Sequence, residues 1–487
     1  MSKNQDRSSC NRKTLTLEKL ESRENQSVTS VWTTGNTLVL RTDNNATSLE
    51  VAQSGSNVRV NEIGSGRSWT YSSASINKVE LQGGNGADRF VNNYYSLPVS
   101  FFGGAGNDYL EGYNGNDYFD GGAGNDTVKA YGGNDTVFGG DGDDVLLGMT
   151  GNDQLVGGNG MDRLNGGAGV DKLWGDAGND VLIAIDNGST DYLEGGTGAD
   201  ALWVDQNGSA RDAIYGALGE DKIQAVANFS NSADRTLDGD RIADPRTLSG
   251  HTYKTFANKQ LFSSSGPQMN DIRQGALGDC YLLAGLSAVA MDSPNTIRQN
   301  VVDFDDGTYG VRFGNSFYRV DNDLAVASSG STNPAYAQLG ADSSMWVAVV
   351  EKAFAHYRTG ANSFASIEGG WSVELNRAWG SSSAGEKSIG SYSNATSLAN
   401  DLYNKWNNYQ SVTIGFLSGS GANIVTGHMY TIARFVRNSG GTITGVVLRN
   451  PWGVDGGGNN DGSNDGYVTV TPAQLMGYTG RVNWGRV

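Results

Sequence analysis

The stretches GGAGNDYLE at residues 103–111 and GGAGNDTVK at residues 121–129 decide the fold of the first part of this chain. They belong to a series in which aspartate recurs at every ninth position from residue 108 to residue 180. A glycine stands two positions before each aspartate, and an apolar residue stands two positions after it. The series consists of Asp108, Asp117, Asp126, Asp135, Asp144, Asp153, Asp162, Asp171 and Asp180.

A period of nine matches neither the 3.6-residue period of a helix nor the two-residue period of a strand. It therefore predicts a repeated unit of a short strand and a tight turn, in which glycine permits positive φ angles. The single apolar residue of each unit would point inward and be buried when neighbouring turns stack. Asp88 precedes the series, and Asp191 and Asp200 follow it after a two-residue insertion, so we expect a solenoid over residues 81–205.

Charge is concentrated in the same segment. Residues 101–200 hold 18 acidic and 3 basic residues, a local balance of −15 within a total net charge of −17. This balance argues against binding to nucleic acid phosphates. Hard oxygen ligands in close succession suit Ca²⁺. No apolar run approaches the ~20 residues of a membrane-spanning helix, so no transmembrane segment is predicted.

The repeats resemble the repeats-in-toxin (RTX) nonapeptide, a calcium-binding parallel β-helix (β-roll) repeat. The resemblance implies that aspartates eighteen positions apart share a Ca²⁺ ion, so the nine aspartates from Asp108 to Asp180 are the expected metal ligands. Without metal, so charged and glycine-rich a segment should be largely disordered. A flexible Gly/Asp linker is the alternative, but it leaves the regular apolar position unexplained. The irregular stretch 181–190 is expected to break one calcium site.

The segments beside the repeats are less regular. Residues 1–26 carry six Lys/Arg and four acidic residues and no apolar core, which predicts a disordered, basic lead-in without a visible secretory signal. Residues 27–80 alternate in short runs, such as TLVLRT at 37–42, and predict a β-rich cap. Residues 206–260 are polar and predict a connector.

The string QGALGDCYLLAGLSAVA at 274–290 places Cys280 in the first turn of an apolar helix from Tyr281 to about Met291. The positive end of a helix dipole favours a thiolate. A small buried hydrophobe is the other interpretation of a lone cysteine. GHMYTIARF at 427–435 places His428 at the head of a strand, and LRNPWG at 448–453 places Asn450 before a proline. The order Cys, His, Asn is the papain-type arrangement.

These strings, together with the helix MWVAVVEKAFA at 345–355, resemble the catalytic core of calpains over residues 261–487. The resemblance implies an α+β papain-like fold in which Cys280 attacks the scissile carbonyl and His428 transfers the proton. It also implies that Asn450 orients the imidazole and that Gln274 donates to the oxyanion. Trp452 would shield the His–Asn bond from water, with plain core packing as the alternative.

Calpain cores also bind calcium, and the resemblance assigns Asp271 and Glu351 as acidic ligands, with a carbonyl ligand at Gly266. Ordinary ion pairs are the alternative for both carboxylates. No EF-hand pattern is visible in the sequence, so calcium control is expected from the core or from the solenoid.

The sequence therefore predicts a multidomain protein, a parallel β-helix solenoid followed by an α+β core. The expected function is that of a calcium-dependent cysteine endopeptidase acting on protein substrates. Calcium-dependent folding predicts an extracellular or cell-surface location in bacteria, by an export route that the sequence does not reveal. Two alternatives stay open: an adhesion protein with a non-proteolytic papain-like domain, and an acyl transferase such as a transglutaminase.

Overall fold

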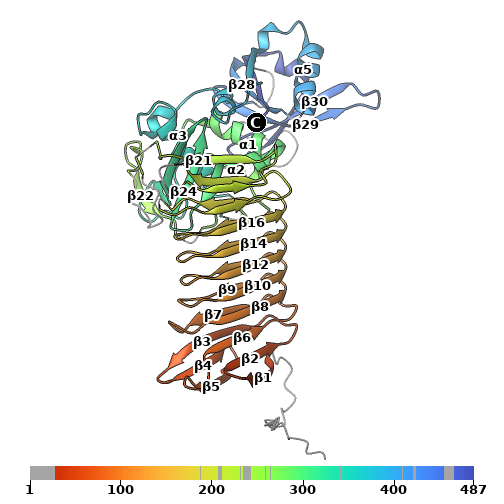
Figure 1. Ribbon diagram of the computed structural model, residues 1–487. Coiled ribbons are helices and arrows are strands. Elements are labelled where there is room, and N and C mark those ends of the chain that lie inside the picture. The colour runs from red at the N-terminus through yellow and green to blue at the C-terminus, as the bar shows by residue number, and fades with distance from the viewer. Residues whose placement is uncertain are drawn as a thin grey trace, which may run out of the picture. The chain divides into compact units, whose positions relative to one another are not determined.

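The computed structural model describes residues 28–186, 188–206, 211–230, 232–233, 243–257, 259–263, 265–340, 343–408, 410–420, 424–454 and 465–487. The chain forms two compact units, Met1–Gly178 and Asn179–Val487. The predicted basic lead-in, residues 1–26, lies outside the described residues. A β-solenoid of about eight turns covers residues 79–226 and is followed by a domain of helices and sheets (Figure 1).

The first unit begins with strands where alternating runs predicted them. β1 pairs antiparallel with β2, and β3, β4 and β5 form an antiparallel meander. β2 and β3 then pair in parallel with β6 and β7, so these strands extend the two sheets of the solenoid. Their bounds are β1 Val28–Thr34, β2 Thr37–Thr42, β3 Ser48–Ser54, β4 Asn57–Glu62, β5 Ser68–Ser72, β6 Lys78–Gln82 and β7 Arg89–Asn93.

Each coil of the solenoid contributes one strand to each of two parallel sheets, with partners eighteen residues apart. All of the predicted inward apolar residues, from Phe90 to Leu202, have no solvent exposure (0%). The strands of the first sheet are β8 Val99–Ala105, β10 Tyr118–Ala123, β12 Thr136–Asp141, β14 Gln154–Asn159 and β16 Lys172–Ala177. Those of the second are β9 Tyr109–Glu111, β11 Thr127–Lys129, β13 Val145–Leu147 and β15 Arg163–Asn165. The stacking predicted from the nine-residue period is confirmed.

Glycine is required where one turn rests on the turn below it. Gly122 has a φ of 105°, and a β-carbon added to it would lie 2.1 Å from the carbonyl oxygen of Gly104. Any larger residue would force neighbouring coils apart, since this distance is far below van der Waals contact.

The second unit starts with further coils. β17 (Val181–Ala184), β19 (Ala201–Asp205) and β21 (Lys222–Val226) pair in parallel, as do β18 (Tyr192–Glu194) and β20 (Ala213–Tyr215). The predicted end of the solenoid at residue 205 is therefore too early, because residues 213–226 of the expected connector form strands. The glycine pattern weakens there while the stacking of strands continues.

The remainder of the second unit is an α+β domain with two cores. The first core surrounds the helix α1 (Cys280–Asp292), whose residues from Tyr281 to Ala290 are all buried, as expected for a helix that is apolar on every side. The other elements are α2 Pro294–Asn300, α3 Trp346–Tyr357, α4 Val373–Ala378, η1 Met269–Asp271, η2 Phe364–Ile367, β22 Thr252–Thr255, β23 Val301–Asp303, β24 Thr308–Phe313, β25 Ser316–Asp321 and β26 Asp323–Val326. β22 lies within the segment predicted as a connector, and it pairs with β26 of this domain.

The second core is a sheet in the order β27–β32–β28–β29–β30–β31, packed against α5 and α6. Its elements are β27 Gly385–Ser388, η3 Ile389–Ser391, α5 Ala395–Asn407, β28 Ser411–Gly419, β29 His428–Arg437, β30 Ile443–Arg449, β31 Tyr467–Val470, α6 Pro472–Leu475 and β32 Tyr478–Gly485. The predicted fold class, a β-helix solenoid followed by an α+β core, is confirmed. Among the described residues, no helix has the length and apolar character needed to cross a bilayer.

Candidate functional site

The repeat aspartates form ladders inside the turns of the solenoid. The carboxylate Oδ1 of Asp126 accepts a hydrogen bond from the backbone N–H of Asp108 (2.7 Å), and Asp144 accepts in the same way from Asp126 (2.7 Å). Asp117, Asp135 and Asp153 form the equivalent ladder on the other side of the coils. Aspartates that are eighteen positions apart in the sequence are therefore in direct contact in the structure.

The second carboxylate oxygen of these residues is suited to bind a cation. In the described part of the chain, the buried Oδ2 atoms of Asp108, Asp126 and Asp144 have no hydrogen-bond partner. A β-carbon on Gly121 would lie 2.4 Å from Oδ2 of Asp126 and 2.6 Å from the carbonyl oxygen of Gly139, so the glycine leaves a cradle lined by oxygens. Burial, together with the neighbouring carboxylates, raises the pKa of Asp126 to about 8. A bound Ca²⁺ would offset this desolvation and repulsion.

The α+β domain places Cys280 as the first residue of α1, as the sequence predicts. The expected lowering of its pKa is not found in this arrangement. Burial raises the pKa of the thiol to about 11, and the carboxylate of Asp279, the N-cap residue of the same helix, adds to the effect. Burial is the largest cause of this rise, because loss of water around the sulfur disfavours the charged thiolate.

His428 begins β29 and is buried. Its Nε2 lies 2.8 Å from Oδ1 of Asn450, which also accepts the backbone N–H of Trp452 at 3.0 Å. Because Oδ1 accepts only, Nε2 carries the hydrogen and Nδ1 is left as the basic nitrogen. The Trp452 ring lies over the imidazole with centroids 4.4 Å apart, and burial lowers the pKa of His428 to about 4.

A pocket of about 250 Å³ brings Cys280 and His428 together in its lining. Glycine supplies much of the remaining wall, and Trp371, Phe416, Leu417 and Met429 supply its apolar part. The glycines are Gly278, Gly369, Gly370, Gly415 and Gly427.

Gln274 lies in the loop before α1. Its Nε2 donates to the carbonyl oxygen of Leu277 (2.6 Å), and its backbone N–H donates to the carbonyl oxygen of Pro451 (2.8 Å). The second contact ties the loop before Cys280 to the segment that follows Asn450. The oxyanion role of Gln274 stays a prediction.

Comparison with known proteins assigns both parts of the chain. Residues 247–464 match the profile of the calpain family of cysteine proteases. Four copies of the RTX calcium-binding nonapeptide repeat match between residues 100 and 184. The chain carries a calpain-type cysteine protease domain and calcium-binding RTX repeats.

The relatives of the protease domain are distant. The calpain-1 catalytic subunit of Mus musculus is 28% identical over 244 residues, which cover 43% of this chain and 32% of that protein. The calpain-1 catalytic subunit of Bos taurus is 28% identical over 224 residues, covering 41% of this chain and 29% of that protein. The chain therefore spans about a third of the length of the curated relatives that it matches.

The two acidic residues predicted as calcium ligands of the protease domain are both buried. Oδ2 of Asp271 accepts the indole N–H of Trp346 (2.9 Å) and the backbone N–H of Gln268 (2.8 Å). Both oxygens of Glu351 face the backbone N–H of Ala337, at 2.9 and 3.1 Å. In the described geometry, N–H groups of the protein donate to Oδ2 of Asp271 and to both oxygens of Glu351. The metal role of both residues stays a prediction.

Glu351 also lies against a residue that sequence reasoning missed. Burial and the adjacent carboxyl of Asp279 raise the pKa of Glu351 well above its ordinary value, and burial raises the pKa of Asp279 to about 6. Two buried carboxyl groups therefore lie beside each other, one of them on the residue that precedes Cys280. The signal available in the sequence was only that Asp279 precedes the cysteine.

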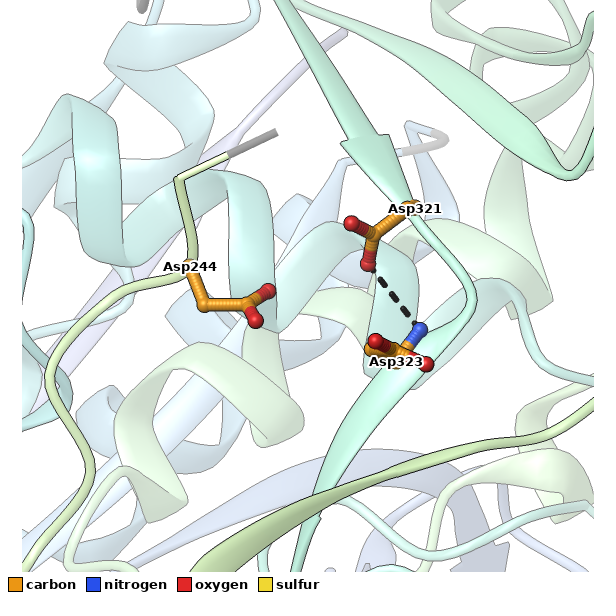
Figure 2. A group of neighbouring side chains, drawn as sticks. All are labelled: Asp244, Asp321 and Asp323. Atoms are coloured by element: carbon orange, nitrogen blue, oxygen red, sulfur yellow. Dashed lines mark hydrogen bonds between the residues drawn. The ribbon is translucent and has the colours of Figure 1, made fainter. Parts of the chain in front are cut away.

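Among the described residues, three carboxylates do gather closely enough to ligate a metal: Asp244, Asp321 and Asp323 (Figure 2). The ammonium group of the buried Lys352 forms ion pairs with Asp244 and Asp321, and it donates to the carbonyl oxygen of Asp323 at 2.8 Å. The lysine therefore supplies the positive charge of this cluster, which ties the segment before β22 to α3.

Proposed function

We propose that the protein is a calcium-dependent cysteine endopeptidase that hydrolyses peptide bonds through Cys280, His428 and Asn450. The observation that supports this proposal best is the 2.8 Å contact between Nε2 of His428 and Oδ1 of Asn450, next to a pocket lined by His428 and Cys280. The contact selects the imidazole tautomer whose Nδ1 can accept the thiol proton.

In the proposed reaction, Nδ1 of His428 takes the proton of Cys280 as the sulfur attacks the scissile carbonyl carbon. The resulting imidazolium protonates the leaving amine, and water then hydrolyses the thioester with His428 as the base. Asn450 keeps the imidazole in place throughout, and Gln274 would donate to the oxyanion. Glycines on several sides of the pocket leave room for the main chain of an extended peptide.

The protonation states of Cys280 and His428 explain why the two side chains would have to be aligned before the reaction. In the geometry described above, a protonated thiol and a neutral imidazole are favoured, because Cys280 is partly buried, His428 is buried, and loss of water disfavours the charged form of each. An imidazolium within hydrogen-bonding distance of the sulfur would stabilise the thiolate and raise the pKa of His428 at the same time. The RTX aspartates, such as Asp108 and Asp126, would hold Ca²⁺, whose positive charge would order the acidic turns. The proposed location, outside a bacterial cell or at its surface, follows from the high calcium concentration found there.

The test is cleavage of an unstructured protein with and without millimolar Ca²⁺, by the wild-type chain and by Cys280→Ala. Calcium-dependent cleavage that the substitution abolishes is the expected result. Analysis of the products distinguishes hydrolysis from acyl transfer, because transfer to an added amine would leave an amide in place of a free carboxylate. A folded chain that cleaves nothing in either condition would refute the proposal.

A further inference from the structure

The outer face of the solenoid changes character in its last coils. The third residue of the short strands is polar in β9 (Glu111), β11 (Lys129) and β15 (Asn165) and apolar in β13 (Leu147), and it is a large apolar residue in both β17 (Ile183) and β19 (Trp203). All five residues of β19 are buried. An apolar outward face on a solenoid strand needs a covering partner.

The protease domain supplies that cover within the second unit. Trp203 packs edge-on against Phe304 (ring centroids 6.2 Å apart) and Phe317 (5.7 Å). Phe229, which follows the last coil, packs against Phe304 and forms a bridge with Phe317 of β25. These residues belong to one buried cluster, which also contains Val302. The last coils and the sheet β23–β24–β25 therefore share a hydrophobic core.

Hydrogen bonds join the same coils to helix α2. The side-chain amide of Gln299 donates to the carbonyl oxygen of Ala199 (3.0 Å), and the carbonyl oxygen of Gln299 accepts from the side chain of Gln224 (2.9 Å). Gln224 and Gln299 are both buried. Helix α2 follows α1, the helix that begins with Cys280. Ala199 is the residue directly before Asp200, so the contact reaches the turn that precedes β19.

This turn has the geometry of the calcium cradles in the earlier coils, although the matched RTX repeats end at residue 184. Asp200 is fully buried, and its Oδ2 has no hydrogen-bond partner in the described part of the chain. A β-carbon on Gly195 would lie 2.3 Å from that oxygen. Oδ1 of Asp200 accepts the backbone N–H of Asp180 (2.9 Å), and the N–H of Asp200 donates to Asp221 (3.2 Å), which repeats the ladder pattern.

We propose that the turn from Gly195 to Asp200 binds a Ca²⁺ ion and that this ion stabilises the protease domain through α2 and the sheet β23–β24–β25. Loss of the ion would leave the Asp200 carboxylate buried without a counter-charge and loosen the start of β19. Trp203 lies three residues after Asp200, so a loosened β19 would also disrupt the hydrophobic core that Trp203 shares with the protease domain. This inference deepens the proposed function, since it names a calcium site that controls the stability of the catalytic domain.

Hydrogen exchange of the full-length chain tests the coupling, with Cys280→Ala present throughout to prevent self-cleavage. At a calcium concentration of one hundred times Kd, openings that release the ion become about 100-fold rarer. Those amides of β24 and β25 that exchange through such openings should then exchange about 100-fold more slowly in calcium than in chelator. Asp200→Asn should abolish most of this effect. The matched control Asp126→Asn, in the first unit, should retain it.

Full calcium-dependent protection of β24 and β25 in Asp200→Asn would overturn the inference. An equal loss of this protection in Asp200→Asn and in the control Asp126→Asn would overturn it as well. If Asp200→Asn does not fold, Gln299→Ala provides the second test. Gln299→Ala should bind as many calcium ions as the parent, as counted by native mass spectrometry, while the protection of β24 falls by at least about tenfold. Unchanged protection would refute the coupling. The measurement uses no peptidase activity, so an inactive but calcium-coupled domain would contradict only the proposed function.

Discussion

Replacing Trp203 by alanine tests whether the last coils are part of the protease unit. The Trp203 side chain has no solvent exposure and packs edge-on against Phe304 and Phe317. Truncating a buried tryptophan to alanine costs about 3–5 kcal/mol of unfolding free energy, which includes the cavity that remains. For a unit as large as Asn179–Val487, each kcal/mol lowers the melting temperature by about 2 °C. We therefore expect Trp203→Ala to lower the Tm of this unit by about 6–10 °C.

Differential scanning calorimetry in saturating calcium measures this shift. Hydrogen exchange of α1 and β28 identifies the transition in which the protease domain unfolds. Ile223→Ala is the matched control, because Ile223 lies in the neighbouring strand β21 and is 48% exposed. The control should change the Tm by about 1 °C or less. If Trp203→Ala leaves the protease transition within about 1 °C of wild type, the shared core does not contribute to the stability of the domain and the reasoning fails.

Three further predictions concern the triad, the repeats and the loop before Cys280. Asn450→Ala should lower kcat by about 100-fold or more with little change in KM, because the imidazole loses its 2.8 Å partner; steady-state kinetics on a peptide substrate measure this, and an unchanged kcat would contradict the triad. The pKa of Asp126 rises from 3.8 to about 8 in the folded coils, so the calcium-free fold binds protons that the unfolded chain releases. Calcium-free coils should therefore be most stable near pH 4 and lose stability as the pH rises toward 8, which circular dichroism in chelator will follow; equal β content at both pH values would be the contrary result. Arg449→Met removes the buried guanidinium donor to the carbonyl oxygen of Ile272 (3.0 Å) and should cost about 1.5–3 kcal/mol in urea unfolding. A wild-type urea midpoint would show that this link between the two cores adds no stability.

Acidic residues illustrate how far sequence reasoning reached in the candidate site. Counting gave the nine-residue period, and the resemblance to RTX repeats implied two units per coil, so that Asp108 and Asp126 were expected to be neighbours, as their ladder shows. Asp271 and Glu351 were chosen by resemblance, and the sequence carried no sign that N–H donors from Trp346 and Ala337 occupy their oxygens. Those donors lie 75 and 14 residues away, at positions that no periodicity relates to the carboxylates.

By itself, the sequence determined the features that depend on neighbours along the chain. The nine-residue period specifies turn, strand and inward residue within each unit, so it specifies the solenoid wherever it is regular. Short motifs placed Cys280 at a helix start, His428 at a strand start and Asn450 before a proline, because each of these positions depends on local backbone preferences.

Only the tertiary structure decided the features that depend on burial and on distant contacts. The pKa of Cys280 rises mainly because its folded surroundings exclude water, and this burial is not visible in the sequence. The solenoid extends to residue 226 because strand pairing continues after the glycine pattern fades. The contact of Trp203 with Phe304 and Phe317 joins the last coils to the protease domain across about one hundred residues. Desolvation and long-range packing arise only when the chain is folded, so the local spacing of residues does not predict them.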